Sequence, residues 1–419
     1  MISASWVLPL DGPPIENGFV RWDDGRIVEV GEGRAERHFE SSVIVPGFVN
    51  AHSHLEYAVY AGFGDGLAFG PWIAVHMERK SRLDRAHMLD IARAGAAESL
   101  ASGITTTADY SFSGTAAAAA QSLGLRAIVY LEVFAKEPDD AERQFAATRA
   151  LVEETELVRI GISPHAPYTC TLDVYRWCLS LGIPVGTHLS ESANENEWLL
   201  HGSGPFTGSP VMVPPTGLRA VPTLEPVLGP DLLCAHCVDL EPHELELLAA
   251  RDVPIAHCPR SNALLGCGIA PVTDLRRAGA RVGLGTDSPA STPSFDMFEE
   301  MRTAVYMARA RDRHAGALSG EDALRLATIG AARALRMDAE VGTLTPGKRA
   351  DLTVVSLAGS PYDPVEDPAA AVVFGGSPER VLETVVEGET RYRTGDNEWR
   401  EVRSTASAAR GRMLAPRQP

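Results

Sequence analysis

Histidines and carboxylates in this sequence recur at the ends of short apolar runs, in patterns suited to metal binding. His52 and His54 follow a run that begins near Pro46. Residues two apart on a strand share a face, so both imidazoles can point to one site. His188 ends another run and offers a third nitrogen ligand, and Asp287 ends a further run and offers a hard oxygen ligand. These four residues predict a site for a divalent metal that activates water.

Two more residues at the ends of such runs are suited to moving protons. Glu191 follows His188 by three residues, beside a ligand without being needed as one, which suits an acid–base group. A helix N-terminal acid stabilised by the helix dipole is the alternative interpretation of Glu191. His236 ends its own run and could be either a metal ligand or a base. We therefore predict Glu191, His236 and Asp287 as the catalytic groups.

The sequence favours one metal over two. A two-metal site of this kind needs a bridging anion, commonly a carboxylated lysine or a glutamate on the fourth strand. The stretch 158–170 contains neither residue type, and the lysines of the chain (Lys80, Lys136 and Lys348) end no predicted strand. Nitrogen and carboxylate ligands suit Zn²⁺, which is the expected metal, with Fe²⁺ as the alternative.

The elements that must position these residues alternate between strand-like and helix-like patterns. Alternation of this kind favours a parallel sheet, and eight strands favour a closed (β/α)₈ TIM-like barrel. The carboxyl ends of barrel strands meet on one face, so groups far apart in sequence would lie together there. The predicted strands span 43–50, 104–109, 126–133, 158–163, 183–188, 232–236, 253–257 and 281–287.

Strand-rich segments at both ends of the chain flank this barrel. The dipeptide Asp24-Gly25 between alternating runs is a hairpin signal. We predict a small β-sandwich domain built from residues 1–46 and 338–393, with the barrel over 47–337. Residues 394–419 are polar and arginine-rich and predict a loosely held tail.

Long connections and further histidines complete the pattern. The connections at 55–83 and 205–230 exceed ordinary loop lengths, and the first carries enough apolar side chains to cover a site. His257 is interpreted as a core histidine and left out of the site. Surface positions are predicted for the histidines in loops or helix-like segments, including His76, which falls in the first long connection. They are His38, His76, His87, His201, His243 and His314.

The composition excludes several classes of protein. The chain has 419 residues, of which 45% are hydrophobic and 22% charged, as in an ordinary globular protein. Its net charge of −17 repels phosphate backbones and argues against nucleic-acid binding. Neither a secretory signal nor a bilayer-spanning run is evident, so a cytoplasmic enzyme without a membrane partner is expected. Cys234 and Cys237 form a C-x-x-C on a predicted strand, where they would face opposite sides and serve a structural role.

As a set, the motifs around these residues resemble the amidohydrolase superfamily, most closely its aminohydrolase and chlorohydrolase branch acting on aromatic heterocycles. The resemblance covers nearly the whole chain. It implies that His52, His54, His188 and Asp287 bind one metal, and that His236 and Glu191 handle protons. The motifs are 46–54, 164–168, 188–191, 235–237, 257–262, 283–287 and 347–352.

The resemblance also suggests a substrate. The motif around His165 resembles those of deaminases acting on adenosine-like nucleosides, including S-adenosylhomocysteine and methylthioadenosine. The connection with Trp72 and the basic Arg79, Lys80 and Arg82 resembles that of enzymes that deaminate aminodeoxyfutalosine in menaquinone synthesis. A cation of this group would then pair with the benzoate of that substrate, and a solvated helix face is the alternative for the group. His165, Trp72 and Arg79 are thus the predicted substrate-binding residues.

The expected function is hydrolytic deamination of an aminated heterocycle, a small-molecule substrate. A chlorohydrolase or a cyclic-amide hydrolase would use the same activated water, and both stay open. A catalytically silent binding protein on the same scaffold is the alternative of another class. Barrels of this kind often pair, so a homodimer is the oligomer to expect.

Overall fold

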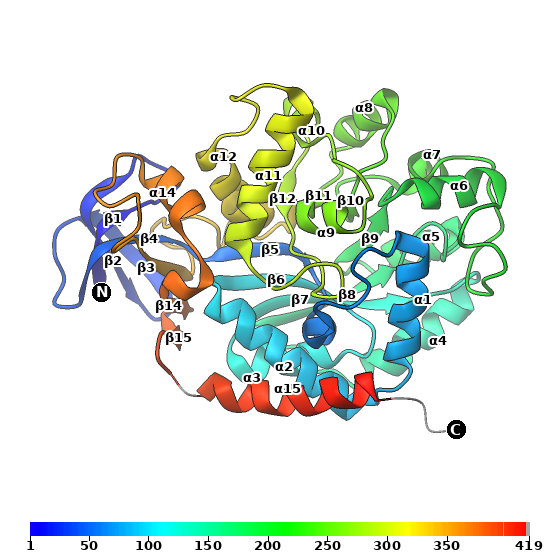
Figure 1. The fold of residues 1–419 in the computed structure, drawn as a ribbon, viewed down its shortest axis with the longest axis horizontal. Coiled ribbons are helices and arrows are strands. Elements are labelled where there is room, and N and C mark those ends of the chain that lie inside the picture. The colour runs from blue at the N-terminus through cyan, green and yellow to red at the C-terminus, as the bar shows by residue number, and fades with distance from the viewer. Residues whose placement is uncertain (397, 416–419) are drawn as a thin grey trace.

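Two sheets organise the chain in the computed structural model, which describes residues 1–396 and 398–415. The larger sheet has eight parallel strands in sequence order from β5 to β12. A bridge between Ser53 and Asp287 brings its first and last strands together, which confirms the predicted (β/α)₈ barrel (Figure 1). Its strands are β5 (Phe48–Ser53), β6 (Ile104–Ser111), β7 (Arg126–Val133), β8 (Val158–Pro164), β9 (Val185–Leu189), β10 (Leu232–His236), β11 (Ile255–His257) and β12 (Val282–Leu284).

Helices between these strands cover the barrel with small or apolar side chains. The short alanines of α3 let it lie close to the sheet, and Asp84 and Asp296 cap α2 and α11 by accepting from backbone amides. The helices are α2 (Arg85–Ala101), α3 (Thr115–Leu123), α4 (Pro138–Arg149), α5 (Leu172–Ser180), α6 (Ala193–His201), α7 (Ala220–Leu224), α8 (Pro242–Ala250), α9 (Pro259–Leu264), α10 (Val272–Arg277), α11 (Met297–Asp312), α12 (Gly320–Arg325) and α13 (Ala331–Ala334).

The smaller sheet is assembled from both ends of the chain. Its seven strands lie in the order β15-β14-β13-β4-β1-β2-β3, and only β1 and β4 pair in parallel. Asp24 and Gly25 have positive φ angles of 45° and 72°, as the predicted hairpin turn requires. The strands are β1 (Ile2–Val7), β2 (Ile15–Asp23), β3 (Arg26–Glu32), β4 (His38–Pro46), β13 (Leu352–Ser356), β14 (Val381–Val386) and β15 (Glu389–Arg393), with α14 (Pro368–Gly375) between β13 and β14.

A direct passage of the chain joins the two sheets. β4 ends at Pro46 and β5 begins at Phe48, and a Cβ at Gly47 would lie only 2.2 Å from side-chain atoms of Thr105. Next to this junction, the buried Arg126 of β7 donates through Nε to Asp351 Oδ2 at 2.9 Å and through Nη2 to Asp351 Oδ1 at 3.2 Å. The small sheet is therefore joined directly to β5, the strand that carries His52, and is held to β7 by the pair of Arg126 and Asp351.

The C-terminal segment is a helix, so the prediction of a loosely held tail at 394–419 is wrong for its described part. Helix α15 (Glu398–Leu414) runs along α2 at the foot of Figure 1. Val402, Ala406, Ala409 and Met413 are buried on it. Because they are spaced three and four residues apart, these side chains form an apolar stripe along one face of the helix. The many arginines around the stripe give the segment a polar composition, so the stripe is not evident from composition alone.

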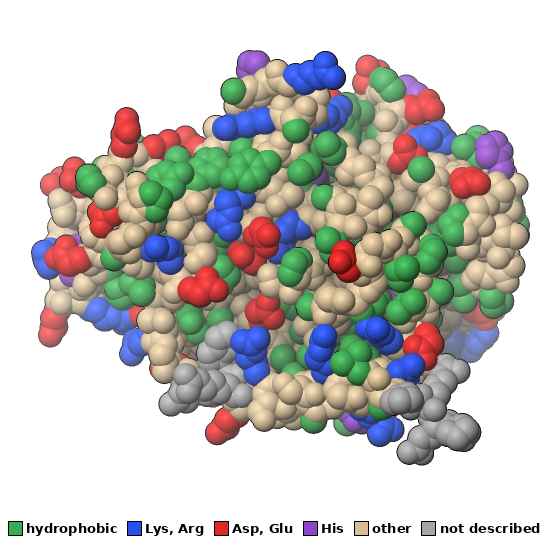
Figure 2. Space-filling model, viewed as in Figure 1, with side chains coloured by type: hydrophobic (Ala, Val, Ile, Leu, Met, Phe, Trp, Pro, Cys, Tyr) green, Lys and Arg blue, Asp and Glu red, His purple; other side chains and the backbone are tan. Residues whose placement is uncertain are grey.

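The long connection at 55–83 also folds, and we call it the lid segment. It contains the short helix η1 (Leu55–Tyr60) and helix α1 (Phe69–Lys80). No helix among the described residues is long and apolar enough to cross a bilayer. On the face shown in Figure 2, acidic and basic side chains are interspersed rather than gathered in one basic band.

Candidate active site

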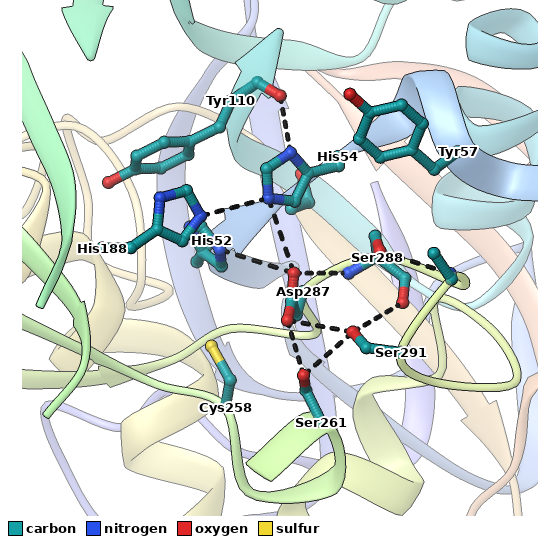
Figure 3. Close-up of polar contacts among 12 residues, drawn as sticks. His52, His54, Tyr57, Tyr110, His188, Cys258, Ser261, Asp287, Ser288 and Ser291 are labelled. Carbon is teal, nitrogen blue, oxygen red and sulfur yellow. Dashed lines mark hydrogen bonds and ion pairs between the residues drawn. The ribbon is translucent and has the colours of Figure 1, made fainter. Parts of the chain in front are cut away.

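The four predicted metal ligands converge at the carboxyl ends of the barrel strands. His52 and His54 come from the end of β5, His188 from β9, and Asp287 from the residues after β12 (Figure 3). Asp287 Oδ1 lies 3.5 Å from Nε2 of His52 and 3.5 Å from Nε2 of His54. Nε2 of His188 lies 3.4 Å from Nε2 of His54. Residues more than 200 positions apart thus present their ligand atoms to one point.

The hydrogen bonds of these imidazoles show that the group fits a metal ion. His54 Nδ1 donates to the carbonyl oxygen of Tyr110, and His188 Nδ1 donates to that of His165, both at 2.8 Å. Burial lowers the pKa of both histidines, so each is neutral and its Nε2 carries a lone pair. Two lone pairs that face each other at 3.4 Å repel unless a cation lies between them. Both ring nitrogens of His52 are buried without a hydrogen-bond partner, which adds a third unsatisfied nitrogen.

Asp287 is oriented by three hydrogen bonds that leave one side of its carboxylate free for a ligand. Its Oδ2 accepts from Ser261 Oγ at 2.6 Å and from Ser291 Oγ at 3.0 Å, and its Oδ1 accepts from the amide of Ser288 at 2.8 Å. Burial alone would raise its pKa. The imidazoles of His52, His236 and His54 beside it instead hold the pKa of Asp287 well below its usual range. The carboxylate is therefore ionised, as a ligand must be.

Glu191 and His236 face each other beside this cluster. His236 Nδ1 donates to Asn262 Oδ1 at 3.0 Å, so its Nε2 is left as an acceptor, 3.8 Å from Glu191 Oε1. Nε2 of His236 has no hydrogen-bond partner among the described residues. One oxygen of Glu191 and one of Asp287 lie within 4.8 Å of a ring nitrogen of His236. The three groups can therefore exchange protons around one bound molecule.

The acidic residue in the first turn of helix α6 is Glu195, so the alternative role predicted for Glu191 is taken by Glu195. The carboxylate of Glu195 accepts the backbone amides of Ser190 at 3.1 Å and of Glu191 at 2.8 Å, next to the start of α6. The side chain of Glu191 is left to face the cavity. Burial and the neighbouring Asp287 carboxylate raise the pKa of Glu191 well above its usual range. A carboxyl that retains its proton is suited to general-acid chemistry.

A cavity of about 610 Å³ opens above these groups, a volume within the range of small-molecule sites. His54, His188, Glu191 and Asp287 form its floor. The lid segment supplies much of its wall, and further aromatic rings come from the loops after the strands. These wall residues include Tyr57, Phe69, Trp72, His76, Lys80, Phe112, Phe134, His165, Tyr168 and Phe206.

The predicted substrate-binding residues divide into two that line the cavity and one that does not. The ring of His165 stacks on Phe134, with centroids 4.5 Å apart, and Trp72 Nε1 donates to the carbonyl oxygen of Ala290 at 3.0 Å. Arg79 is not among the lining residues, and its guanidinium lies 4.7 Å from the ring centroid of Phe63. The cation of the lid segment that lines the cavity is Lys80 instead.

Three cavity residues were not singled out by the sequence analysis, which named one of them, Lys80, only together with Arg79 and Arg82. His76, predicted at the surface, is buried within the lid segment, and Lys80 is also buried. Trp72, His76 and Lys80 are spaced four apart, which places them on one face of α1. That spacing is a signal that a helical reading of the segment would have found. Glu132, the third residue, is a single carboxylate in the otherwise apolar end of β7.

Other predicted features lie away from this site. His257 is buried at the end of β11 and belongs to none of the ligand clusters among the described residues. Cys234 and Cys237 are free and buried beside β10. Burial raises the pKa of both thiols, which disfavours the thiolate that metal binding would need.

Comparisons with known proteins agree with this geometry. The model of the amidohydrolase family matches residues 43–391. A 5-methylthioadenosine/S-adenosylhomocysteine deaminase from Syntrophobacter fumaroxidans is 34% identical over 402 residues, covering 90% of this chain and 89% of that protein. A 5′-deoxyadenosine deaminase from Methanothermobacter thermautotrophicus is 31% identical, with coverages of 93% and 92%.

Solved structures show the same architecture. An adenosine deaminase from Xanthomonas campestris with bound zinc superposes with a TM-score of 0.88 at 26% identity, covering 98% of each chain. An atrazine chlorohydrolase from Arthrobacter aurescens complexed with zinc shares the fold, with a TM-score of 0.84 at 21% identity, covering 98% of this chain and all of that one (100%). The family match at 43–391 spans every predicted ligand and proton-transfer group. The chain therefore belongs to the amidohydrolase family and is a hydrolase that acts on non-peptide C–N bonds.

Proposed function

We propose that this protein is a metal-dependent deaminase of a 6-aminopurine nucleoside, which replaces the 6-amino group by oxygen from water and releases ammonia. The observation that carries the proposal is the convergence of a three-histidine, one-aspartate ligand set with Glu191 and His236 beneath one cavity. The relatives named as deaminases of methylthioadenosine, S-adenosylhomocysteine and 5′-deoxyadenosine support a nucleoside substrate.

His52, His54, His188 and Asp287 would hold the metal, and we propose Zn²⁺, with Fe²⁺ as the alternative. When bound, such a metal lowers the pKa of a coordinated water so that it can attack carbon at neutral pH. The zinc in two structural neighbours supports this choice.

The protein's own groups would move the protons. His236 Nε2, fixed by the hydrogen bond from Nδ1 to Asn262, accepts a proton from the attacking water. Glu191 holds a proton on its carboxyl and gives it to the ring nitrogen next to C6, which leaves that carbon open to attack. Asp287, oriented by Ser261 and Ser291, would take the second proton of the same water and give it to the 6-amino group, which leaves as ammonia. The first proton would pass from His236 to the carboxylate of Glu191, so that both groups regain their starting state.

The finer identity of the substrate concerns its 5′ substituent, for which we propose aminodeoxyfutalosine. Lys80 Nζ lies 3.6 Å from the ring centroid of Phe112 and 3.4 Å from the hydroxyl of Tyr57 in the cavity wall. An ammonium beside Phe112, whose ring contacts that of Phe134, suits a benzoate, whose carboxylate would pair with the cation and whose ring would lie against the aromatic side chains. Methylthioadenosine has no such anion.

The test is ammonia release by the purified, metal-analysed protein from a panel of nucleosides. The panel contains aminodeoxyfutalosine, S-adenosylhomocysteine, methylthioadenosine, 5′-deoxyadenosine and adenosine. We expect turnover of the panel with a preference for aminodeoxyfutalosine that Lys80→Met abolishes. Equal turnover of methylthioadenosine would contradict the role of the cation.

No ammonia from any member, with about one metal per chain, would contradict the deaminase proposal. A ring chloride or a cyclic amide would then be tested, because both reactions use the same activated water. Binding of a nucleoside without any product would indicate a catalytically silent protein. The Glu191→Gln variant provides the background rate in each assay.

A further inference from the structure

The C-terminal helix α15 is tied to both ends of the lid segment. Arg410 donates through Nη1 to the carbonyl oxygen of Val59, and through Nη2 to that of Ala61 at 3.0 Å. In the opposite direction, Arg82 Nη1 donates to the carbonyl oxygens of Met413 at 2.8 Å and Ala415 at 2.6 Å. Thus one arginine of the lid segment and one arginine of α15 each donate hydrogen bonds to backbone carbonyls of the other segment.

An apolar contact lies between these two sets of hydrogen bonds. The side chain of Met413 is fully buried and packs in one cluster with Tyr57, Tyr60 and Phe63 of the lid segment. Ala290, whose carbonyl oxygen accepts from Trp72 Nε1, belongs to the same cluster. A residue six positions from the end of the chain therefore fills space directly beneath the lid segment.

The rings that Met413 supports contact residues of the cavity wall. The ring centroid of Tyr57 lies 4.5 Å from that of His76 and 5.5 Å from that of His54, on which it stacks. The ring of Phe63 stacks on Trp72 at 5.9 Å. Met413 itself lines no part of the cavity, so its influence on a substrate must pass through these rings.

From these contacts we infer that Arg410 and Met413 are positioning residues for substrate binding, because they hold the lid segment in the place where it completes the cavity. The metal ligands lie on barrel strands or directly after them, so we expect them to keep their geometry when the contacts of α15 are lost. The lid segment, in contrast, joins the barrel at its two ends, and between them it relies on contacts with neighbouring segments. Loss of α15 contacts would favour local opening of the lid segment over global unfolding.

This inference concerns how the cavity is held and so goes beyond the proposed chemistry. Its test combines hydrogen–deuterium exchange of peptides from 55–83 with metal analysis and steady-state kinetics on the nucleoside that the panel identifies. For Arg410→Ala and Met413→Ala we expect lid-segment exchange to rise about tenfold or more. KM should rise about tenfold while kcat stays within about threefold and metal content is unchanged.

Conservative and control variants separate positioning from general destabilisation. Met413→Leu keeps the apolar volume and should restore exchange and KM to near the wild-type values. Ser404→Ala on the exposed side of α15, and Arg277→Ala on α10, should change neither. Arg277→Ala is the matched control for Arg410→Ala, and Ser404→Ala is the control for a substitution on the exposed side of α15.

Unchanged lid-segment exchange in both alanine variants would overturn the inference. A fall in kcat and metal content at unchanged KM would also overturn it, since α15 would then support the barrel as a whole. The exchange measurement needs no substrate. If the wild-type protein releases no ammonia, the proposed function fails while the exchange result still decides whether α15 holds the lid segment.

Discussion

Individual site residues differ in how well their roles can be predicted from the sequence. His52 and His54 could be predicted because a spacing of two on a strand fixes a shared face whatever surrounds it. His76 could not be predicted, because its segment has the composition of a loop. Lys80 could not be told apart from Arg79 and Arg82 until the helix α1 turned it, with His76, towards the cavity. Glu132 was missed for another reason, since one carboxylate in an apolar strand carries no spacing to interpret.

At the scale of one residue, Glu191→Gln tests the proton donor. The amide keeps the size of the side chain but cannot give up a proton, so kcat should fall by about 10² to 10⁴. Metal content should stay at the wild-type level because Glu191 lies beside the predicted ligands rather than among them. Glu153→Gln, at an exposed position, is the matched control and should leave kcat unchanged.

The pH profile gives the same variant a second readout. Burial and Asp287 raise the pKa of Glu191, so its carboxyl keeps the proton to higher pH than an ordinary glutamate. A step that needs this proton slows as the pH rises through the raised pKa. We expect an alkaline fall in kcat of the wild-type enzyme that the residual activity of Glu191→Gln lacks. Near-normal turnover by that variant would remove Glu191 from the mechanism.

Among the elements, the barrel strands were predictable and the C-terminal helix was not. Buried parallel strands read as continuous apolar runs, and the run at β7 matches its predicted bounds of 126–133. Strands β11 and β12 are only three residues long, shorter than the runs that predict them, because the outer residues of those runs fall outside the strand ladders, where Asp287 forms only an isolated bridge to Ser53. In α15, the buried residues recur at every third or fourth position from Val402 to Met413, and arginines between them give the segment the composition of a surface tail.

The junction between the two sheets yields a prediction at this scale. Arg126 and Asp351 are almost fully buried, so Asp351→Asn leaves the guanidinium with a weakened partner in a medium of low polarity. We expect a loss of about 3 kcal/mol in the free energy of unfolding and a lower Tm. Thermal unfolding measures the change, and Asp24→Asn in the exposed hairpin turn is the control. An unchanged Tm for Asp351→Asn would show that the ion pair contributes little to the junction.

For the whole molecule, removal of the metal should lower stability as well as abolish activity. A ligand present at about a thousand times its Kd contributes about 4 kcal/mol to the folded state. Without it, the facing nitrogens of His54 and His188 are left unsatisfied. We expect a chelator to lower the Tm of the wild-type protein and Zn²⁺ to restore it, followed by differential scanning fluorimetry.

The variant His52→Ala provides the control for this experiment. It removes one of the predicted ligands, so its Tm should respond weakly to chelator and to Zn²⁺. If the wild-type Tm stayed constant although metal analysis showed that the ion had been lost, the metal would not contribute to the stability of the barrel.

The metal ligands and the lid segment are separate parts of the chain, and this separation has a consequence for the evolution of such proteins. Ligands on strand ends are constrained by the barrel, while the lid segment that lines the cavity supplies none of them. Substitutions within 55–83 can therefore change which substrate is bound while the metal ligands stay the same. Because α15 packs beneath that segment, its residues would have to change in step with it. Lineages that switch substrate should thus show paired substitutions in two stretches that lie more than 300 residues apart in the sequence.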